Sequence, residues 1–180
     1  MRNGCKPGCR HLNAIGRRAV YQDLRAQHLA LGASCRYPRS LVEALGTTLV
    51  ICKPDAVERG LVGEILARFE RRGLRLLRAE LRTLDGETAA KHYVEHVGKP
   101  FYEGLISHIT RGPVVLAVVG GPEGTWQVVR QMMGATDPAQ SAPGTIRGDL
   151  AISMTENVIH GSDSAESARR EIALFFPDLA

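Results

Sequence analysis

The sequence predicts an α+β protein in which strands and helices are interleaved along the chain. Short apolar runs, such as residues 48–53, are typical of buried strands. Between these runs, apolar residues recur at spacings of three and four, which is typical of amphipathic helices. A hydrophobic fraction of 44% in 180 residues is ample for the core of one domain.

The expected elements alternate along the chain. In order they are a strand at 48–53, helix at 62–72, strand at 74–83, helix at 85–96, short helix at 102–110, strand at 113–120, helix at 123–133, strand at 151–155 and final helix from 165. Ile65 and Phe69 belong to the apolar stripe of the first helix. Leu74 and Leu76 suggest a half-buried strand. Residues 142–149 are expected to be a loop, because Pro and Gly interrupt them and no periodicity survives.

The spare length of the chain lies at its start. Residues 1–45 contain eight Lys or Arg against two acids, which gives +6, whereas the remaining residues have a net charge of −2. The pI of about 9.1 therefore comes from this segment. We expect residues 1–45 to be a basic, poorly ordered extension and residues 46–180 to be the domain. Cys5, Cys9 and His11 lack the paired two-residue spacing of a zinc site.

The most informative segment is residues 157–164, where His160 precedes Gly161 and a run of polar residues. Gly161 has no Cβ, so substrate could approach the backbone closely there. The following Ser and Asp residues can satisfy free N–H groups at the start of a helix. Within that helix Glu171 lies off the apolar stripe and is the kind of residue that orients an imidazole. This arrangement can make a histidine a nucleophile, although a packed core or turn histidine fits the same pattern.

Two basic residues suggest phosphate chemistry. Lys53 ends the first apolar run, and Arg147 lies in the centre of the expected loop. Arginine makes bidentate phosphate contacts and lysine a point-charge contact, so both suit a triphosphate. No Gly-x-x-x-x-Gly-Lys-Ser/Thr string occurs, so side chains must hold the phosphates.

The chain resembles the nucleoside diphosphate kinases, most closely the bacterial ones, over residues 47–177. The segments that carry the resemblance are 51–57 (ICKPDAV), 59–65 (RGLVGEI), 92–93 (HY), 98–102 (GKPFY), 107–115, 143–149 (PGTIRGD) and 157–164 (NVIHGSDS). The resemblance implies a ferredoxin-like βαββαβ sandwich: a four-stranded antiparallel sheet with helices covering one face. It also implies transfer of the terminal phosphate of a nucleoside triphosphate, mainly ATP, to a nucleoside diphosphate, which maintains the (d)NTP pools.

The implied mechanism is a ping-pong cycle that uses Mg²⁺ and a pros-phosphohistidine at His160. Ser162 would bond Glu171, and Glu171 would orient His160. Lys53 would contact the ribose hydroxyl and the transferred phosphate, with Tyr93 beside it. The remaining implied nucleotide contacts are His96, Arg130, Thr136 and Arg147 to phosphate, Phe101 and Met154 to the base, and Asn157 to the ribose. Because a base held by its faces is not read on its edge, we expect broad nucleotide specificity.

No carboxylate cluster spaced for a dedicated metal site stands out, so Mg²⁺ would be carried mainly by the substrate phosphates. The resemblance also implies a cytoplasmic homo-oligomer, with a hexamer favoured and a tetramer possible, and no membrane partner. Two alternatives stay open. His160 could pass phosphate to protein targets, or the basic first 45 residues could bind nucleic acid, a partner that we do not expect because the domain itself is slightly acidic.

Overall fold

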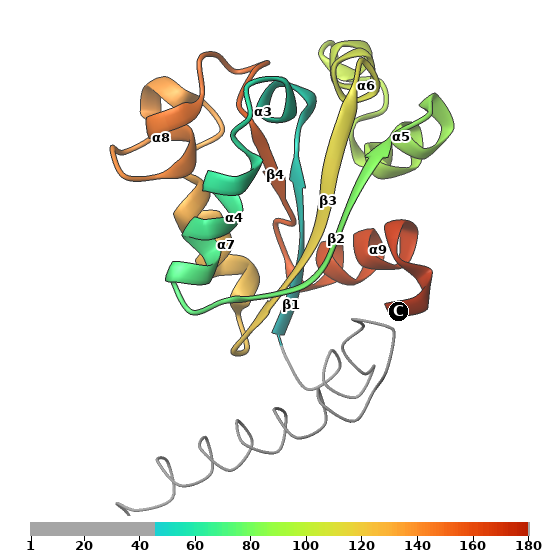
Figure 1. The fold of residues 1–180 in the computed structure, drawn as a ribbon. Helices are drawn as coiled ribbons and strands as arrows, with labels where there is room; N and C mark the ends of the chain where they lie inside the picture. The colour runs from blue at the N-terminus through green and yellow to red at the C-terminus, as the bar shows by residue number, and fades with distance from the viewer. Residues whose placement is uncertain (1–45, 180) are drawn as a thin grey trace, which may run out of the picture. The chain divides into compact units, whose positions relative to one another are not determined.

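The computed structural model describes residues 46–179 (Figure 1). Its elements run in the order β1 (Gly46–Cys52), α3 (Pro54–Glu58), α4 (Val62–Arg71), β2 (Arg75–Thr83), α5 (Gly86–His92), η1 (Val94–His96), α6 (Tyr102–Thr110), β3 (Pro113–Gly121), α7 (Thr125–Met133), η2 (Pro138–Gln140), α8 (Ile146–Leu150), β4 (Ile159–Gly161), α9 (Ala165–Phe175) and η3 (Pro177–Leu179). The expectations about residues 1–45 lie outside this described part. None of the helices described there combines the length and the apolar character that a membrane span requires.

The four strands form one sheet in the order β2-β3-β1-β4, and every neighbouring pair is antiparallel. β1 therefore lies inside the sheet between β3 and the short β4. The expected four-stranded antiparallel sheet of α+β class is confirmed. The β1-α4-β2-β3-α7-β4 path is the βαββαβ core of a ferredoxin-like fold, with α5 and α6 inserted between β2 and β3.

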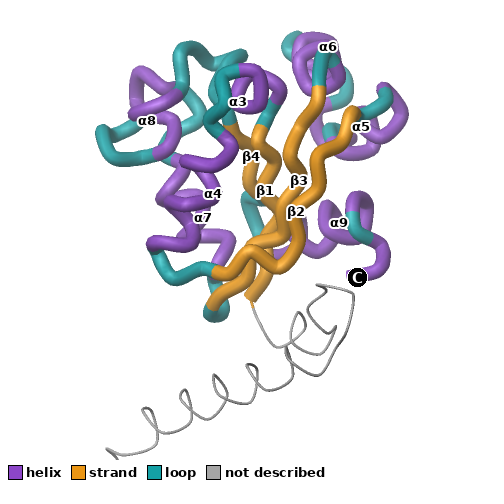
Figure 2. Tube along the Cα trace, viewed as in Figure 1, coloured by secondary structure: helices purple, strands orange, loops and turns teal. Residues whose placement is uncertain are grey.

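Helices cover both faces of the sheet, as Figure 2 shows. On one face, Val50 and Cys52 of β1 pack with residues of α4 and α7; on the other, Leu49 and Ile51 pack with residues of α5, α6 and α9. The two helices of the βαββαβ core, α4 and α7, cover one face, as the resemblance implied, and α5, α6 and α9 cover the second face. Burial on both sides explains why residues 49–52 of β1 are all apolar instead of alternating.

Local sequence explains where the helices begin. Asp85 accepts a hydrogen bond from the Thr88 N–H at the start of α5, and Ser164 accepts one from the Ser167 N–H at the start of α9. Each side chain satisfies one of the free donors at a helix N-terminus. The expected helix at 85–96 is divided, because α5 ends at His92 and a single 3₁₀ turn, η1, follows.

Two expectations near the site were wrong. Residues 151–155 form no strand, and Ile152 and Met154 are 67% and 62% exposed. The position beside β1 is taken instead by β4, which carries His160. The expected loop around Arg147 contains α8, whose N-cap Thr145 accepts a hydrogen bond from the Gly148 N–H. A helix of five residues is too short to show a periodicity, as is α3, which the sequence did not reveal.

Candidate active site

His160 projects from β4 toward the face that α5 and α9 cover. It is paired in register with Ile51, which packs on that same face, and directly opposed residues share a face of the sheet. Gly161 faces the other way: an added Cβ would lie 2.6 Å from Met133 Sδ of α7. Gly161 is therefore needed for close packing of α7 on β4, and not, as we expected, for the approach of substrate.

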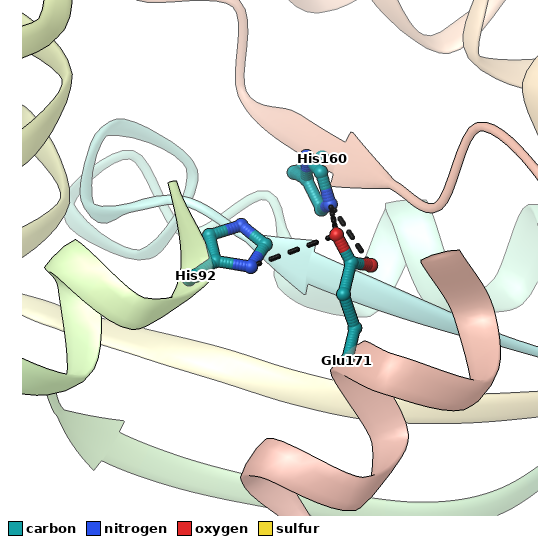
Figure 3. A group of neighbouring side chains, drawn as sticks. All are labelled: His92, His160 and Glu171. Atoms are coloured by element: carbon teal, nitrogen blue, oxygen red, sulfur yellow. Dashed lines mark hydrogen bonds and ion pairs between the residues drawn. The ribbon is translucent and has the colours of Figure 1, made fainter. Parts of the chain in front are cut away.

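Glu171 of α9 meets the His160 ring directly (Figure 3). His160 Nε2 lies 3.1 Å from Glu171 Oε1 and 3.3 Å from Oε2, and Ser162 Oγ donates to Oε2 at 2.6 Å. Ser162 Oγ also accepts from the Leu49 N–H at 3.3 Å, so its direction is fixed by the central strand. Burial alone would raise the pKa of Glu171. The hydrogen bond from His160, its charge and that of His92, and the Ser162 hydroxyl outweigh burial and hold this pKa at about 2.

This pairing determines which nitrogen of His160 can react. An ionised carboxylate only accepts hydrogen bonds, so Nε2 must carry the proton. In the neutral ring the lone pair then resides on Nδ1. The arrangement provides an imidazole of fixed tautomer with Nδ1 available as a nucleophile and Glu171 in place to stabilise positive charge on the ring.

His92 completes this group, and the sequence assigned it no role. Its side chain at the end of α5 is fully buried, with its ring 4.6 Å from that of His160 in an edge-on arrangement. His92 Nδ1 lies 3.6 Å from Glu171 Oε1, and neither ring nitrogen makes a hydrogen bond. Burial, assisted by the charge of His160, lowers the pKa of His92 to about 3, so its ring is neutral. The proximity of two histidines from distant segments left no local signal in the sequence.

Lys53 and Asn157 form a second buried contact in the site. Lys53 Nζ donates to Asn157 Oδ1 at 2.6 Å, and Asn157 Nδ2 donates to the carbonyls of Met154 at 3.0 Å and Thr136 at 3.4 Å. Asn157 thus ties the end of β1 to two loops. Burial, followed by the charge of Arg147, lowers the pKa of Lys53 to about 8. The charged form of such a lysine, disfavoured by burial and by a neighbouring cation, is stabilised when an anion binds beside it.

Arg147 is held beside the nucleophile by backbone groups. Its guanidinium donates to the carbonyl of Ile159 at 2.8 Å and to that of Gly134 at 3.2 Å, while its buried Nε has no partner. Burial and the charge of Arg130, near the end of α7, lower the pKa of Arg147 to about 10. Lys53, Arg130 and Arg147 therefore concentrate positive charge, of which the nearby Asp55 carboxylate acts on Lys53, and this charge suits phosphate oxygens.

Aromatic rings line one side of the site. The Tyr93 and His96 rings stack at 6.0 Å, and the His96 and Phe101 rings meet edge-on at 5.7 Å. Phe101 is 53% exposed. The structure thus brings the twelve predicted residues into two sets. The first set contains His160, Glu171, Ser162, Lys53, Asn157, Arg130 and Arg147, with Thr136 and Met154 joined to Asn157 through their carbonyls; the second contains the rings of Tyr93, His96 and Phe101.

The fold and this site define an α+β protein in which a partly exposed histidine pairs with a buried glutamate next to a cluster of cations, an arrangement suited to phosphoryl transfer. Comparison with known proteins makes the class specific. The family model described as nucleoside diphosphate kinase matches residues 46–180. A nucleoside diphosphate kinase of Thermomicrobium roseum is 60% identical over 129 residues, which are 72% of this chain and 86% of that protein. One from Rhodococcus opacus is 58% identical over 134 residues, covering 74% and 96%.

A solved structure of the same family is also similar to this chain. The halophilic nucleoside diphosphate kinase from Halobacterium salinarum, in complex with CDP, superimposes with a TM-score of 0.70 at 48% identity, covering 72% of this chain and 86% of that one. The chain belongs to the nucleoside diphosphate kinase family. It is an enzyme that transfers phosphate between nucleotides, as the sequence predicted.

Proposed function

We propose that the enzyme works by a ping-pong mechanism through a phosphohistidine at His160 Nδ1. The observation that carries this proposal is the pairing of His160 Nε2 with the Glu171 carboxylate, which leaves Nδ1 as the nucleophilic nitrogen. In the first half-reaction Nδ1 bonds to the terminal phosphorus of a nucleoside triphosphate, mainly ATP, and the diphosphate leaves. In the second, the oxygen of another diphosphate takes the phosphoryl group from Nδ1, which maintains the (d)NTP pools.

Charge on the phosphates would be balanced by side chains on three sides. Arg147 lies next to β4 through the Ile159 carbonyl, Lys53 is tied to Asn157, and Arg130 is close enough to Arg147 to lower its pKa. Thr136 and His96 would add further contacts to phosphate oxygens. Such groups, held before the substrate arrives, stabilise the charge that spreads over the transferring phosphoryl group.

The base would lie between Phe101 and Met154, both largely exposed apolar side chains. Asn157 would reach the ribose, in contact with Lys53. Stacking requires only a π-face, which purines and pyrimidines share, so one site would accept all the common bases. The Halobacterium salinarum relative was solved with CDP, a pyrimidine diphosphate, which supports this breadth.

The reaction would require Mg²⁺, and the residues present suit an ion carried by the substrate. Among the described residues, the Glu171 carboxylate is already engaged by His160 and Ser162, and that of Asp55, close to Lys53, by His108 and Val158. Mg²⁺ prefers oxygen ligands and retains several waters, so it would be bound by the phosphates while Lys53 and the arginines hold the nucleotide. When bound, the ion neutralises phosphate charge.

Self-association and location are part of the same proposal. β2 is one of the two outer strands of the sheet, and its Leu81 is 65% exposed. Among the described residues no further strand pairs with the free edge of β2, and such an edge with an apolar side chain favours pairing with another copy of the chain. We propose a cytoplasmic homo-oligomer, with a hexamer favoured over a tetramer. Light scattering of the purified protein would distinguish these masses, and a monomer would refute the assembly.

The test of the mechanism uses γ-labelled ATP and Mg²⁺ with the wild-type chain and the His160→Ala variant. We expect an acid-labile, base-stable label that requires His160 and leaves on addition of either GDP or CDP. Label that forms equally in His160→Ala would refute the mechanism. Label that stays on His160 until a protein acceptor is added would favour transfer to protein targets instead.

A further inference from the structure

Val158 is the one residue other than glycine with positive φ in the described part of the chain, at φ +59°. It is β-branched and fully buried. Such a side chain is disfavoured in the left-handed region and stays there only when its surroundings impose that conformation. Val158 lies between two site residues, Asn157 and His160 of β4. The backbone here therefore controls where both of these side chains point.

The surroundings that impose this conformation are hydrogen bonds from the segment after β1. The Val158 N–H donates to Asp55 Oδ2 at 2.9 Å, and the Val158 carbonyl accepts from the Lys53 N–H at 2.9 Å. The Ile159 N–H closes a three-residue turn on the Asn157 carbonyl at 2.7 Å. Only one of these contacts comes from a side chain, that of Asp55.

Asp55 is itself held firmly. It lies in the first turn of α3, is 1% exposed, and meets His108 Nε2 of α6 through Oδ1 at 3.2 Å. Burial alone would raise the pKa of Asp55, but the hydrogen bonds from His108 and the Val158 N–H hold it below the ordinary value. Asp55 is thus an ionised, fixed acceptor, and it makes no contact with His160 or Glu171 that could give it a direct chemical role.

We propose that Asp55 is a positioning residue: by binding the Val158 N–H it maintains the left-handed turn that places His160 and Asn157 for phosphoryl transfer. This inference rests on the proposed role of His160 as nucleophile. The rival explanation is that Asp55 acts through its negative charge on nearby Lys53. Asparagine separates the two, because its amide oxygen can still accept from Val158 while the charge is gone.

A change at Val158 gives a second way to distinguish the positioning role of Asp55 from an effect of its charge. Glycine adopts positive φ as readily as negative φ, so a Val158→Gly chain does not need a side chain to impose the turn. If Asp55 acts through this turn, its removal must matter less when residue 158 is glycine. Two residues that act through one feature give non-additive effects in a double-mutant cycle.

The experiment measures the single-turnover rate of His160 phosphorylation at saturating Mg²⁺-ATP, per folded molecule and well below the melting temperature of each full-length variant. We expect Asp55→Asn to stay within about threefold of wild type and Asp55→Ala to fall about tenfold or more, since a buried N–H loses its partner. Adding Asp55→Ala to Val158→Gly should slow the rate by only about threefold. A contribution to stability alone would lower the melting temperature without changing these rates.

Each other outcome overturns the proposal. Asp55→Ala at the wild-type rate, Asp55→Asn as slow as Asp55→Ala, or strictly additive effects with Val158→Gly would each do so. If Asp55→Ala does not fold, recovery of folding in Asp55→Ala/Val158→Gly supports the proposal, and failure to recover it while Val158→Gly folds refutes it. Failure of the proposed function would look different, because the wild-type chain itself would take no label at His160, and this inference would fall with it.

Discussion

Ser162 Oγ donates to Glu171 Oε2 at 2.6 Å, so the carboxylate that pairs with His160 is fixed from both sides. The hydroxyl in turn accepts from the Leu49 N–H of the central strand. The orientation of the nucleophile therefore depends on a chain of contacts that begins in the most buried part of the sheet. A group held this way costs no reorganisation when charge develops on the ring.

We expect Ser162→Ala to be destabilising and to slow phosphorylation of His160. The change leaves the buried Leu49 N–H without a partner, which costs about 1–3 kcal/mol of unfolding free energy. It also frees the Glu171 carboxylate to turn, so the rate per folded molecule should fall. Urea unfolding and single-turnover labelling measure the two effects.

Ser164→Ala is the matched control for that variant. Ser164 caps the same helix, α9, and contacts Ser167 but not Glu171. Its loss should cost about 1 kcal/mol of stability and leave the rate of labelling unchanged. If both serine variants lose the same stability and label at the same rate, the orienting role of Ser162 is wrong.

We expect the unfolding free energy of His92→Phe to fall less than that of wild type as the pH is lowered. The pKa of His92 is lowered to about 3, mainly by burial, whereas a free histidine titrates near 6.5. Between those values the unfolded chain binds a proton that the folded chain does not, so stability falls as pH drops from 6.5 toward 3. Phenylalanine removes this contribution, at most about 1.4 kcal/mol per pH unit. Urea unfolding at pH 7, 5.5 and 4 measures the slope.

His96→Phe is the control for that slope, because the His96 ring is only partly buried and pairs with exposed Lys99. It should retain the wild-type dependence on pH. A His92→Phe chain whose stability falls as steeply as that of wild type between pH 6.5 and 4 would mean that His92 is protonated in the folded state.

We expect loss of the Lys53 charge to make kcat/KM decline at alkaline pH. The pKa of Lys53 is lowered to about 8, first by burial and then by Arg147, so the free enzyme loses this charge as pH rises through that value. Since only the charged form attracts phosphate, kcat/KM should fall by up to tenfold per pH unit above about 8. Burial and the Glu171 charge raise the pKa of Tyr93, so its phenol does not titrate in that range.

The variant Lys53→Arg tests whether Lys53 causes this decline, because an arginine at position 53 keeps its charge at a pH where lysine loses it. The variant should have a lower rate but no decline between pH 8 and 9, below the range in which Arg147 loses its charge, whereas Lys99→Gln, a change at an exposed lysine, should keep the decline. Persistence of the alkaline decline in Lys53→Arg would assign it to another residue.

The sequence was sufficient wherever a structural signal was local. The apolar run of β1, the stripe through Ile65 and Phe69, and the polar start of α9 were all visible in short windows, and these elements formed. The three-residue β4 was missed because it has no pattern of its own and exists only by pairing with β1. An apolar pair at Ile152 and Met154 took its place in the prediction, although both side chains are exposed.

The contacts of the site were likewise predictable only where the residues are close in the sequence. His160, Glu171 and Ser162 lie within one segment of twelve residues, so their types and order already suggested a contact. The approach of His92 from α5, and the acceptor that Asp55 offers to Val158 across 103 residues, arise from the packing of distant elements. The left-handed backbone at a valine contradicts its own conformational preference, and no sequence pattern predicts it.

Phe101→Ala and Met154→Ala should weaken the binding of every nucleotide by a similar factor. Both side chains are largely exposed and offer an apolar surface to a base face, with no hydrogen-bonding group for its edge. Losing a stacking aromatic costs about 1–3 kcal/mol whichever base is bound. We therefore expect KM for ADP, GDP, CDP and UDP to rise together in Phe101→Ala and to recover in Phe101→Trp. Val97→Ala, a change at another exposed apolar residue, should leave all four values unchanged. An increase confined to purines or to a single base would show that the site reads base edges, and the prediction of broad specificity would be wrong.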